Sequence, residues 1–203
     1  MTSSRQLQLI LASASKSRKD LLEKAGLSFE SITANVDEDE LKVSLQSAGA
    51  TAAETALALA ELKALRISRD YPAHYIIGAD QMLDCNGVWF DKPADRDHAR
   101  AHLAALRGKT HFLQTAVCVA LAGTVIWHHI DEAALYMRPF SDDFLEEYLQ
   151  QTGDGILSCV GAYQLEGLGV QLFQKIDGDF FSILGLPLLP LLDFIRGHRI
   201  ILS

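Results

Sequence analysis

The sequence predicts an α/β protein built on a mixed sheet, and two observations lead to this prediction. Short apolar runs typical of buried strands alternate along the 203 residues with segments whose apolar residues recur at helical spacing. Two long strand-like segments, residues 110–121 and 124–137, are separated only by Ala122 and Gly123, so they must pair in antiparallel fashion. We find no repeat or linker, and we expect a single domain over residues 1–203 with two lobes flanking a cleft.

The first half of the chain begins with a strand that leads into a helix. Residues 7–12 form an apolar run short enough for a central strand. From Ser15 onward, Leu21 and Leu22 lie on one helical face, and Gly26 is a natural stop. Further along we expect a strand over residues 29–34, an amphipathic helix over 51–68, a buried strand over 75–79 and a hairpin over 82–90 that turns at Asn86 and Gly87.

The second half continues the alternation of helices and strands. Residues 94–106 are expected to form a helix that ends near Gly108, and the two long strands follow. Ser141, with two aspartates after it, is typical of a helix N-terminus. We then expect a helix over residues 141–151, a turn-rich glycine segment, a hairpin around Asp177 and Gly178, and a helix from about 188 to 196.

The composition indicates a soluble globular protein. Hydrophobic residues make up 49% of the chain and charged residues 22%, which argues against disorder. Eighteen basic and 26 acidic residues give a formal net charge of −8. Binding of a nucleic-acid polymer or of a membrane is therefore not expected, whereas a small anion needs only a few cations in one cleft. No run reaches the ~18 apolar residues of a membrane span.

The cysteines and the N-terminal segment favour a cytoplasmic protein. Cys85, Cys118 and Cys159 show no metal-like spacing, so we interpret them as free thiols in a reducing compartment. Residues 7–15 loosely resemble a secretory signal, but basic residues follow directly, and a buried first strand explains the segment better.

The segment from Ser13 to Arg18 is the first candidate for chemistry. A strand runs there into three serines, Ser13, Ser15 and Ser17, and then into a helix whose N-terminus and Arg18 suit phosphate oxygens. A serine-capped helix with exposed Lys and Arg is the alternative. On this segment alone the alternative is preferred, because the spacing is not that of a P-loop.

Four further candidates follow along the chain. Asp80 comes just after an apolar strand, where α/β sheets place ligands, and it could hold Mg²⁺ or accept a proton. On this segment alone, an Asp that merely begins a turn is the preferred interpretation. Lys92 lies before a proline on a stiff segment and could meet a phosphate, or could be a solvated lysine. The acidic run at residues 37–40 could supply Glu38 as a metal ligand, or could be a solvated loop. Lys63, in the Ala/Leu-rich helix, could point into a cleft or reach the surface.

Other patterns do not support a site. His98 and His102 lack the glutamate of a zinc-protease helix, and His128 and His129 point to opposite faces of a strand. No dinucleotide-binding or nucleophile-elbow motif is present.

Four segments in unbroken order resemble the Maf family of nucleoside triphosphate pyrophosphatases, from Leu9 to about Ile195. They read LILASASKSRKDLLEKAGLSFE, IIGADQMLDCNGVWFDKP, LRGKTHFLQTAV and GAYQLEGLGVQLFQKIDGDFFSILGLPL. The resemblance implies an elongated, twisted mixed sheet flanked by helices, as in inosine triphosphatases, with two lobes around a central cleft and often a homodimer. It also implies cleavage of a nucleoside triphosphate between the α- and β-phosphates with Mg²⁺ or Mn²⁺.

The resemblance assigns expected roles to the candidates. Asp80 matches the family's catalytic carboxylate, and with Glu38 it is expected to hold the metal. The remaining expected phosphate-binding residues are Ser13, Ser15, Arg18, Lys63 and Lys92.

Departures from the commonest Maf pattern indicate the substrate. The usual Ser-Pro-Arg-Arg reads Ser15-Lys16-Ser17-Arg18, while Gln81 and Glu166 resemble the subgroup active on 7-methyl-GTP, as does Cys159. Ser17, Gln81 and Glu166 are therefore the expected specificity residues, although that subgroup carries a large aromatic residue at the position of Ser17. A pyrimidine preference, for dTTP or UTP, and a nucleotide-binding regulator of cell division with little turnover are the alternatives.

Overall fold

The computed structural model describes residues 9–201 and contains a mixed sheet of seven strands. The strand order is β2-β1-β3-β5-β6-β7, with β4 paired to β3 outside this path. β1 lies parallel to β2 and β3, whereas the other pairs are antiparallel, which confirms the predicted mixed sheet. The strands are β1 (Leu9–Leu11), β2 (Glu30–Ser31), β3 (Tyr75–Cys85), β4 (Val88–Phe90), β5 (Thr110–Leu121), β6 (Thr124–Met137) and β7 (Phe173–Asp177).

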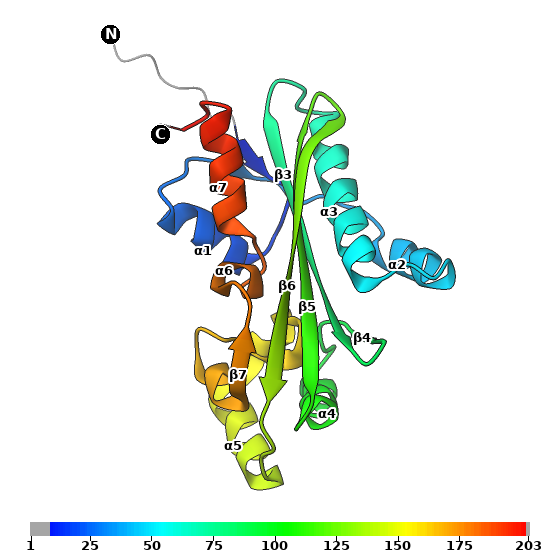
Figure 1. The fold of residues 1–203 in the computed structure, drawn as a ribbon, viewed down its shortest axis with the longest axis vertical. Coiled ribbons are helices and arrows are strands. Elements are labelled where there is room, and N and C mark those ends of the chain that lie inside the picture. Colours follow the sequence, from blue (N-terminus) through cyan, green and yellow to red (C-terminus); the bar gives the residue numbers. More distant parts are fainter. Residues whose placement is uncertain (1–8, 202–203) are drawn as a thin grey trace.

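Helices flank the sheet along its length, as Figure 1 shows, with α3 on one side and α1, α6 and α7 on the other. Polar side chains start several of them: Thr51 and Glu54 form a capping box at α3, and Ser141 caps α5 as predicted. The helices are α1 (Lys16–Lys24), α2 (Glu38–Ser47), α3 (Ala52–Ser68), α4 (Arg96–Leu106), α5 (Asp142–Thr152), α6 (Phe180–Ile183) and α7 (Leu188–Gly197), with 3₁₀ helices at Gly153–Ser158, Val160–Ala162 and Leu168–Leu172.

The long strand β3 passes through more than one apolar core. Ile76 and Ile77 belong to the two clusters beneath α3 and beneath α1 and α7. Leu83 and Cys85, at the other end of the strand, belong to a third cluster with α4 and α5. The strand therefore connects the two ends of the elongated molecule.

Helix α3 packs on β3 at very close range. A Cβ atom on Gly78 would lie 2.2 Å from the Ala60 carbonyl oxygen and 2.8 Å from Ala64 Cβ, so only glycine fits there. Because the helix and the strand approach so closely, Lys63 on α3 reaches Asp80, two residues beyond Gly78.

Several expected boundaries are wrong. Asp80 does not follow the end of a strand, because β3 continues to Cys85 and pairs with β5 throughout. Asp177 and Gly178 do not form a hairpin, because β7 ends there, pairs with β6 and leads into α6. The strand expected at residues 29–34 is limited to Glu30–Ser31, and the acidic run is the start of α2 instead of a loop.

Other expectations are confirmed. The turn at Asn86 and Gly87 joins β3 to β4, with both residues at positive φ. The two long strands pair in antiparallel fashion. The first expected strand is present from Leu9, while Leu7 and Gln8 lie outside the described residues. All three cysteines are free thiols.

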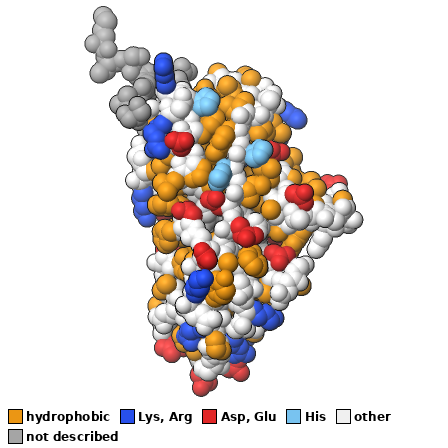
Figure 2. Space-filling model, in the orientation of Figure 1, with side chains coloured by type: hydrophobic (Ala, Val, Ile, Leu, Met, Phe, Trp, Pro, Cys, Tyr) orange, Lys and Arg blue, Asp and Glu red, His pale blue; other side chains and the backbone are white. Residues whose placement is uncertain are grey.

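No helix within residues 9–201 is both long and apolar enough to cross a bilayer. Figure 2 shows acidic and basic side chains interspersed on the lower half of the face that carries β6 and α7.

Candidate functional site

A polar cleft of about 1000 Å³ lies where the β1–α1 loop, α3, β3 and the segment before α7 meet. All the residues singled out from the sequence border it. They are Ser13, Ser15, Ser17, Arg18, Glu38, Lys63, Asp80, Gln81, Lys92 and Glu166. Residues from one end of the chain to the other are thus assembled into one site.

A buried charge cluster occupies the inner part of the cleft. Lys63 Nζ lies 2.5 Å from Asp80 Oδ1 and 2.9 Å from Glu38 Oε2. The Lys63 and Asp80 side chains are each only 9% exposed, while Glu38 is 39% exposed. Lys63 therefore points into the cleft, and the alternative that it extends to the surface is wrong.

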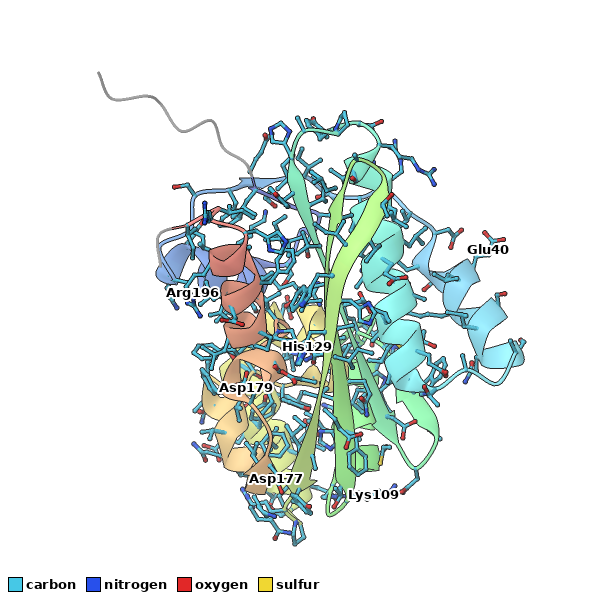
Figure 3. The ribbon with its side chains drawn as sticks, turned by 45° about the horizontal axis from the view of Figure 1, so that its top comes forward. Glu40, Lys109, His129, Asp177, Asp179 and Arg196 are labelled. Atoms are coloured by element: carbon cyan, nitrogen blue, oxygen red, sulfur yellow. The ribbon has the colours of Figure 1, made fainter. Side chains whose placement is uncertain are left out.

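The acidic residues 37–40 at the start of α2 have different environments. Asp37 accepts a hydrogen bond from the Glu40 backbone N–H and caps the helix. Figure 3 shows Glu40 on the outer side of α2, away from the body of the protein, where it is exposed. Of the four acidic residues only Glu38 pairs with Lys63, while Asp37 and Asp39 also border the cleft. The run is therefore a helix start that places acidic side chains at the site.

Arg18 is held rigidly in the wall of the cleft. Its Nε donates to the Gly185 carbonyl oxygen at 2.7 Å, and its Nη1 donates to Ser13 Oγ at 3.2 Å. Burial lowers the pKa of the Arg18 guanidinium, and attraction to Asp80 and Glu38 acts in the opposite direction. Arginine has so high an intrinsic pKa that it stays charged at neutral pH, so a fixed cation faces the cleft.

The β1–α1 loop is both a serine-capped helix start and a part of the cleft wall. Ser15 Oγ accepts the Arg18 backbone N–H and caps α1, as in the alternative of a serine-capped helix. The same alternative placed Arg18 on the exposed surface, which is wrong because Arg18 is buried. Ser13, Ser15 and Ser17 border the cleft at the N-terminus of this helix.

Gln81 connects β3 to α6. Its Nε2 lies 2.8 Å from Thr115 Oγ1, 2.9 Å from the Ser182 carbonyl oxygen and 3.2 Å from the Ile183 carbonyl oxygen. Ser182 Oγ lies 2.6 Å from Asp131 Oδ2, to which it donates, and 3.1 Å from Asp179 Oδ1; Figure 3 labels Asp179 beside α6. The amide of Gln81 thus helps to fix the segment whose end, Gly185, holds Arg18.

Lys92 and Glu166 are exposed and lie at the rim of the cleft. Neither is drawn into the buried charge cluster. Both also border a second groove of about 870 Å³ beside α1, α6 and α7.

Two features of the cleft have no counterpart among the residues predicted from the sequence. Lys42 on α2 forms an ion pair with Asp91, with Nζ and Oδ1 2.5 Å apart, at the edge of the cleft. Burial alone would lower the pKa of Lys42, but the hydrogen bond and charge of Asp91, with Asp80 and Glu38, raise it. The second is Tyr163, which lines the cleft and has its hydroxyl 2.8 Å from His111 Nε2. Residues this far apart in sequence leave no local pattern.

The donor set suits a hard divalent cation. Asp80 and Glu38 bring two carboxylates to one point, and Lys63 contacts one oxygen of each. No group of three or more potential His, Cys, Asp or Glu ligands is found in the described part of the chain. Two carboxylates completed by water and phosphate oxygens are what Mg²⁺ accepts, whereas Zn²⁺ needs a fuller set of protein ligands.

Fold and site together define an α/β protein whose cleft offers carboxylates and fixed cations to a phosphorylated ligand. The family described as "Maf-like protein" matches residues 8–198, and the chain belongs to this Maf family.

Curated relatives match over nearly the whole chain. The "Nucleoside triphosphate pyrophosphatase" of Granulibacter bethesdensis is 56% identical, over 95% of this chain and 98% of its own. That of Paramagnetospirillum magneticum is 54% identical over 93% and 97%. The "7-methyl-GTP pyrophosphatase" of Rhizobium johnstonii is 48% identical over 93% and 95%.

Proposed function

We propose that the protein is a nucleoside triphosphate pyrophosphatase that releases a nucleoside monophosphate and pyrophosphate, and that it acts on modified nucleotides such as 7-methyl-GTP. The convergence of Asp80 and Glu38 on Lys63, with Arg18 fixed nearby, is the observation that carries this proposal. The names of the relatives support the reaction, and the 48% identical relative named for 7-methyl-GTP supports the finer preference.

The residues of the cleft divide the work of hydrolysis. Arg18, held by Ser13 and Gly185, presents a fixed guanidinium to phosphate oxygens and to the charge that develops on leaving pyrophosphate. Lys63 and, from the rim, Lys92 add two further cations. Asp80 orients the attacking water at the α-phosphorus and accepts its proton.

A divalent cation completes this arrangement. Asp80 and Glu38 are the residues that would hold Mg²⁺ or Mn²⁺, with Lys63 adjusting its contacts to the two carboxylates. When bound, the ion neutralises phosphate oxygens and favours ionisation of water.

Glu166 carries the base preference. N7-methylguanine has a delocalised positive charge, and its Watson–Crick edge offers N–H donors. A carboxylate accepts those hydrogen bonds and offsets the charge, and it disfavours the carbonyl acceptors of thymine and uracil. Glu166 lies at the exposed rim of the cleft, where a base can reach it.

A screen of pyrophosphate release tests the function. Ordinary and modified triphosphates are compared with Mg²⁺, with Mn²⁺ and with chelator, and 7-methyl-GTP is expected to be cleaved fastest. Much faster cleavage of dTTP or UTP would refute the base preference, and nucleotide binding without turnover would support the regulator instead.

Two matched variants locate the reaction in the cleft. Asp80→Asn should reduce turnover by at least about a hundred-fold without unfolding the protein, because it removes the base and one metal ligand. Asp70→Asn, which changes an exposed carboxylate paired with Arg66, should leave turnover unchanged. Retained turnover in Asp80→Asn contradicts the assignment.

A further inference from the structure

The second groove combines large apolar side chains with charged ones, among them Lys16, Asp20 and Lys24, and it is continuous with the catalytic cleft. Most of its large apolar residues come from three helices: Leu21 from α1, Phe180 and Phe181 from α6, and Leu188, Leu189 and Leu192 from α7, while Leu184 follows α6. Figure 1 shows these helices on the same side of the sheet. Ser17, Lys92, Gln164 and Glu166 border both the groove and the cleft, so a ligand can extend from one into the other.

Phe180 is an exposed aromatic ring on a rigid support. Its side chain is 48% exposed, and Leu189 in the same groove is 54% exposed. Helix α6, which carries Phe180, is fixed by the Ser182 and Ile183 carbonyls that accept from Gln81. The Phe180 ring also packs edge-on against Phe181, with centroids 5.9 Å apart. Two large apolar side chains exposed together in one groove beside a cleft offer a contact surface to a ligand.

We propose that this groove binds the nucleobase, with Phe180 as the stacking surface and Glu166 as the polar group that reads the base edge. The inference rests on the proposed function and adds the part of the site that the base occupies. The buried charge cluster of Lys63, Asp80 and Glu38 lies in the inner cleft, which suits the triphosphate and its metal. The exposed aromatic ring of Phe180 lies in the groove, which suits a base. Glu166 borders both the cleft and the groove, so it can contact a base that extends from the cleft into the groove.

The chemistry of the base fits this surface. A purine needs an apolar face to stack on and polar groups at its edge. A positively charged base such as N7-methylguanine is attracted to the face of an aromatic ring and to a nearby carboxylate. Phe180 and Glu166 line one groove and supply these two features.

Titration with 7-methyl-GMP, the product of the proposed reaction, tests the inference without turnover. Phe180→Ala should weaken its binding by about ten-fold or more, because base–aromatic stacking contributes on that scale, and Phe180→Trp should preserve it. In steady-state kinetics, Phe180→Ala should raise KM for 7-methyl-GTP with little change in kcat. The matched control is Val170→Ala, which shortens another exposed apolar side chain, 52% exposed, outside the groove.

Each outcome separates the inference from the proposed function. If the wild-type protein cleaves 7-methyl-GTP and Phe180→Ala binds 7-methyl-GMP normally, the inference is overturned and the function stands. If the wild-type protein cleaves other triphosphates but does not bind 7-methyl-GMP, the inference is again overturned, while pyrophosphatase activity stands. If Phe180→Ala instead abolishes self-association in sedimentation and leaves binding unchanged, a second copy of the chain covers the groove.

Discussion

Lys63 Nζ lies 2.5 Å from Asp80 Oδ1, and both side chains are nine-tenths buried. The pair joins helix α3 to strand β3 at the base of the cleft. Removing two charges from water is costly, so a buried ion pair is weak evidence of a contribution to stability. Its position against Glu38 indicates instead that the pair keeps a charged site assembled.

Lys63→Met should destabilise the protein by about 3–5 kcal/mol, because it leaves Asp80 buried without its partner. Urea unfolding followed by circular dichroism measures the change. Lys42→Met is the control, since Lys42 pairs with a carboxylate that is 62% exposed and should cost at most about 1 kcal/mol. The double variant Lys63→Met/Asp80→Leu should recover most of the stability and none of the turnover. A single variant as stable as wild type would contradict this account.

Gly78→Ala should destabilise the fold by about 3 kcal/mol and reduce turnover, because its Cβ would lie 2.2 Å from a backbone oxygen of α3. Displacing α3 moves Lys63 away from Asp80, so activity and stability should fall together. Gly197→Ala is the matched control, since a Cβ there meets no atom within 4 Å. Thermal unfolding and pyrophosphate release measured on both variants decide the matter, and normal behaviour of Gly78→Ala would disprove the close packing.

Gln81→Ala should loosen α6, because three acceptors at 2.8–3.2 Å lose their common donor. We expect a loss of about 1–2 kcal/mol and faster amide hydrogen exchange over residues 180–185. Gln81→Glu should be more disruptive, since it places a carboxylate against carbonyl oxygens. Gln151→Ala, at an exposed site, is the control. Unchanged exchange in Gln81→Ala would show that the amide does not hold α6.

His111 should make stability depend on pH. Burial lowers its folded-state pKa to about 4, against about 6.5 in the unfolded chain. Since the unfolded chain takes up the proton first, this stability is fully present above about pH 6.5 and is lost as the pH falls toward 4. We expect a loss of about 2 kcal/mol between pH 7 and pH 5.

Urea unfolding at the two pH values measures this dependence in wild type and in His111→Phe. The variant removes the partner of the Tyr163 hydroxyl, so its stability at pH 7 is lower, but its pH dependence should be flatter. An equal slope in the two proteins would exclude His111 as the titrating group.

The mixed sheet and most helices follow from local pattern, but the course of β3 does not. The apolar run before Asp80 suggests that the strand ends there, because a carboxylate is rarely buried. In fact β3 continues because β5 pairs with it up to Asp84, a long-range contact that no window of sequence contains. The same limit explains why the hairpin expected around Asp177 is absent: β7 pairs back to β6.

The sequence predicts which residues belong to the candidate site, but it does not predict how they are arranged. The motif order identified Asp80, Arg18 and Lys63 as residues of interest. Which way Lys63 points depends on the close packing at Gly78, and the Lys42–Asp91 pair depends on how α2 lies across the cleft edge. Both depend on packing between segments that are distant in the sequence, which composition and spacing do not predict.

Because β3 packs into separate apolar cores, it couples the unfolding of the two ends of the protein. Ile77 and Leu83 lie in different apolar clusters, with Asp80 on the strand between them. Because the same strand packs into both clusters, unfolding of one end removes packing from the other. We therefore expect unfolding to be a single cooperative event. A ligand that binds at Asp80 should therefore stabilise both ends of the molecule against unfolding.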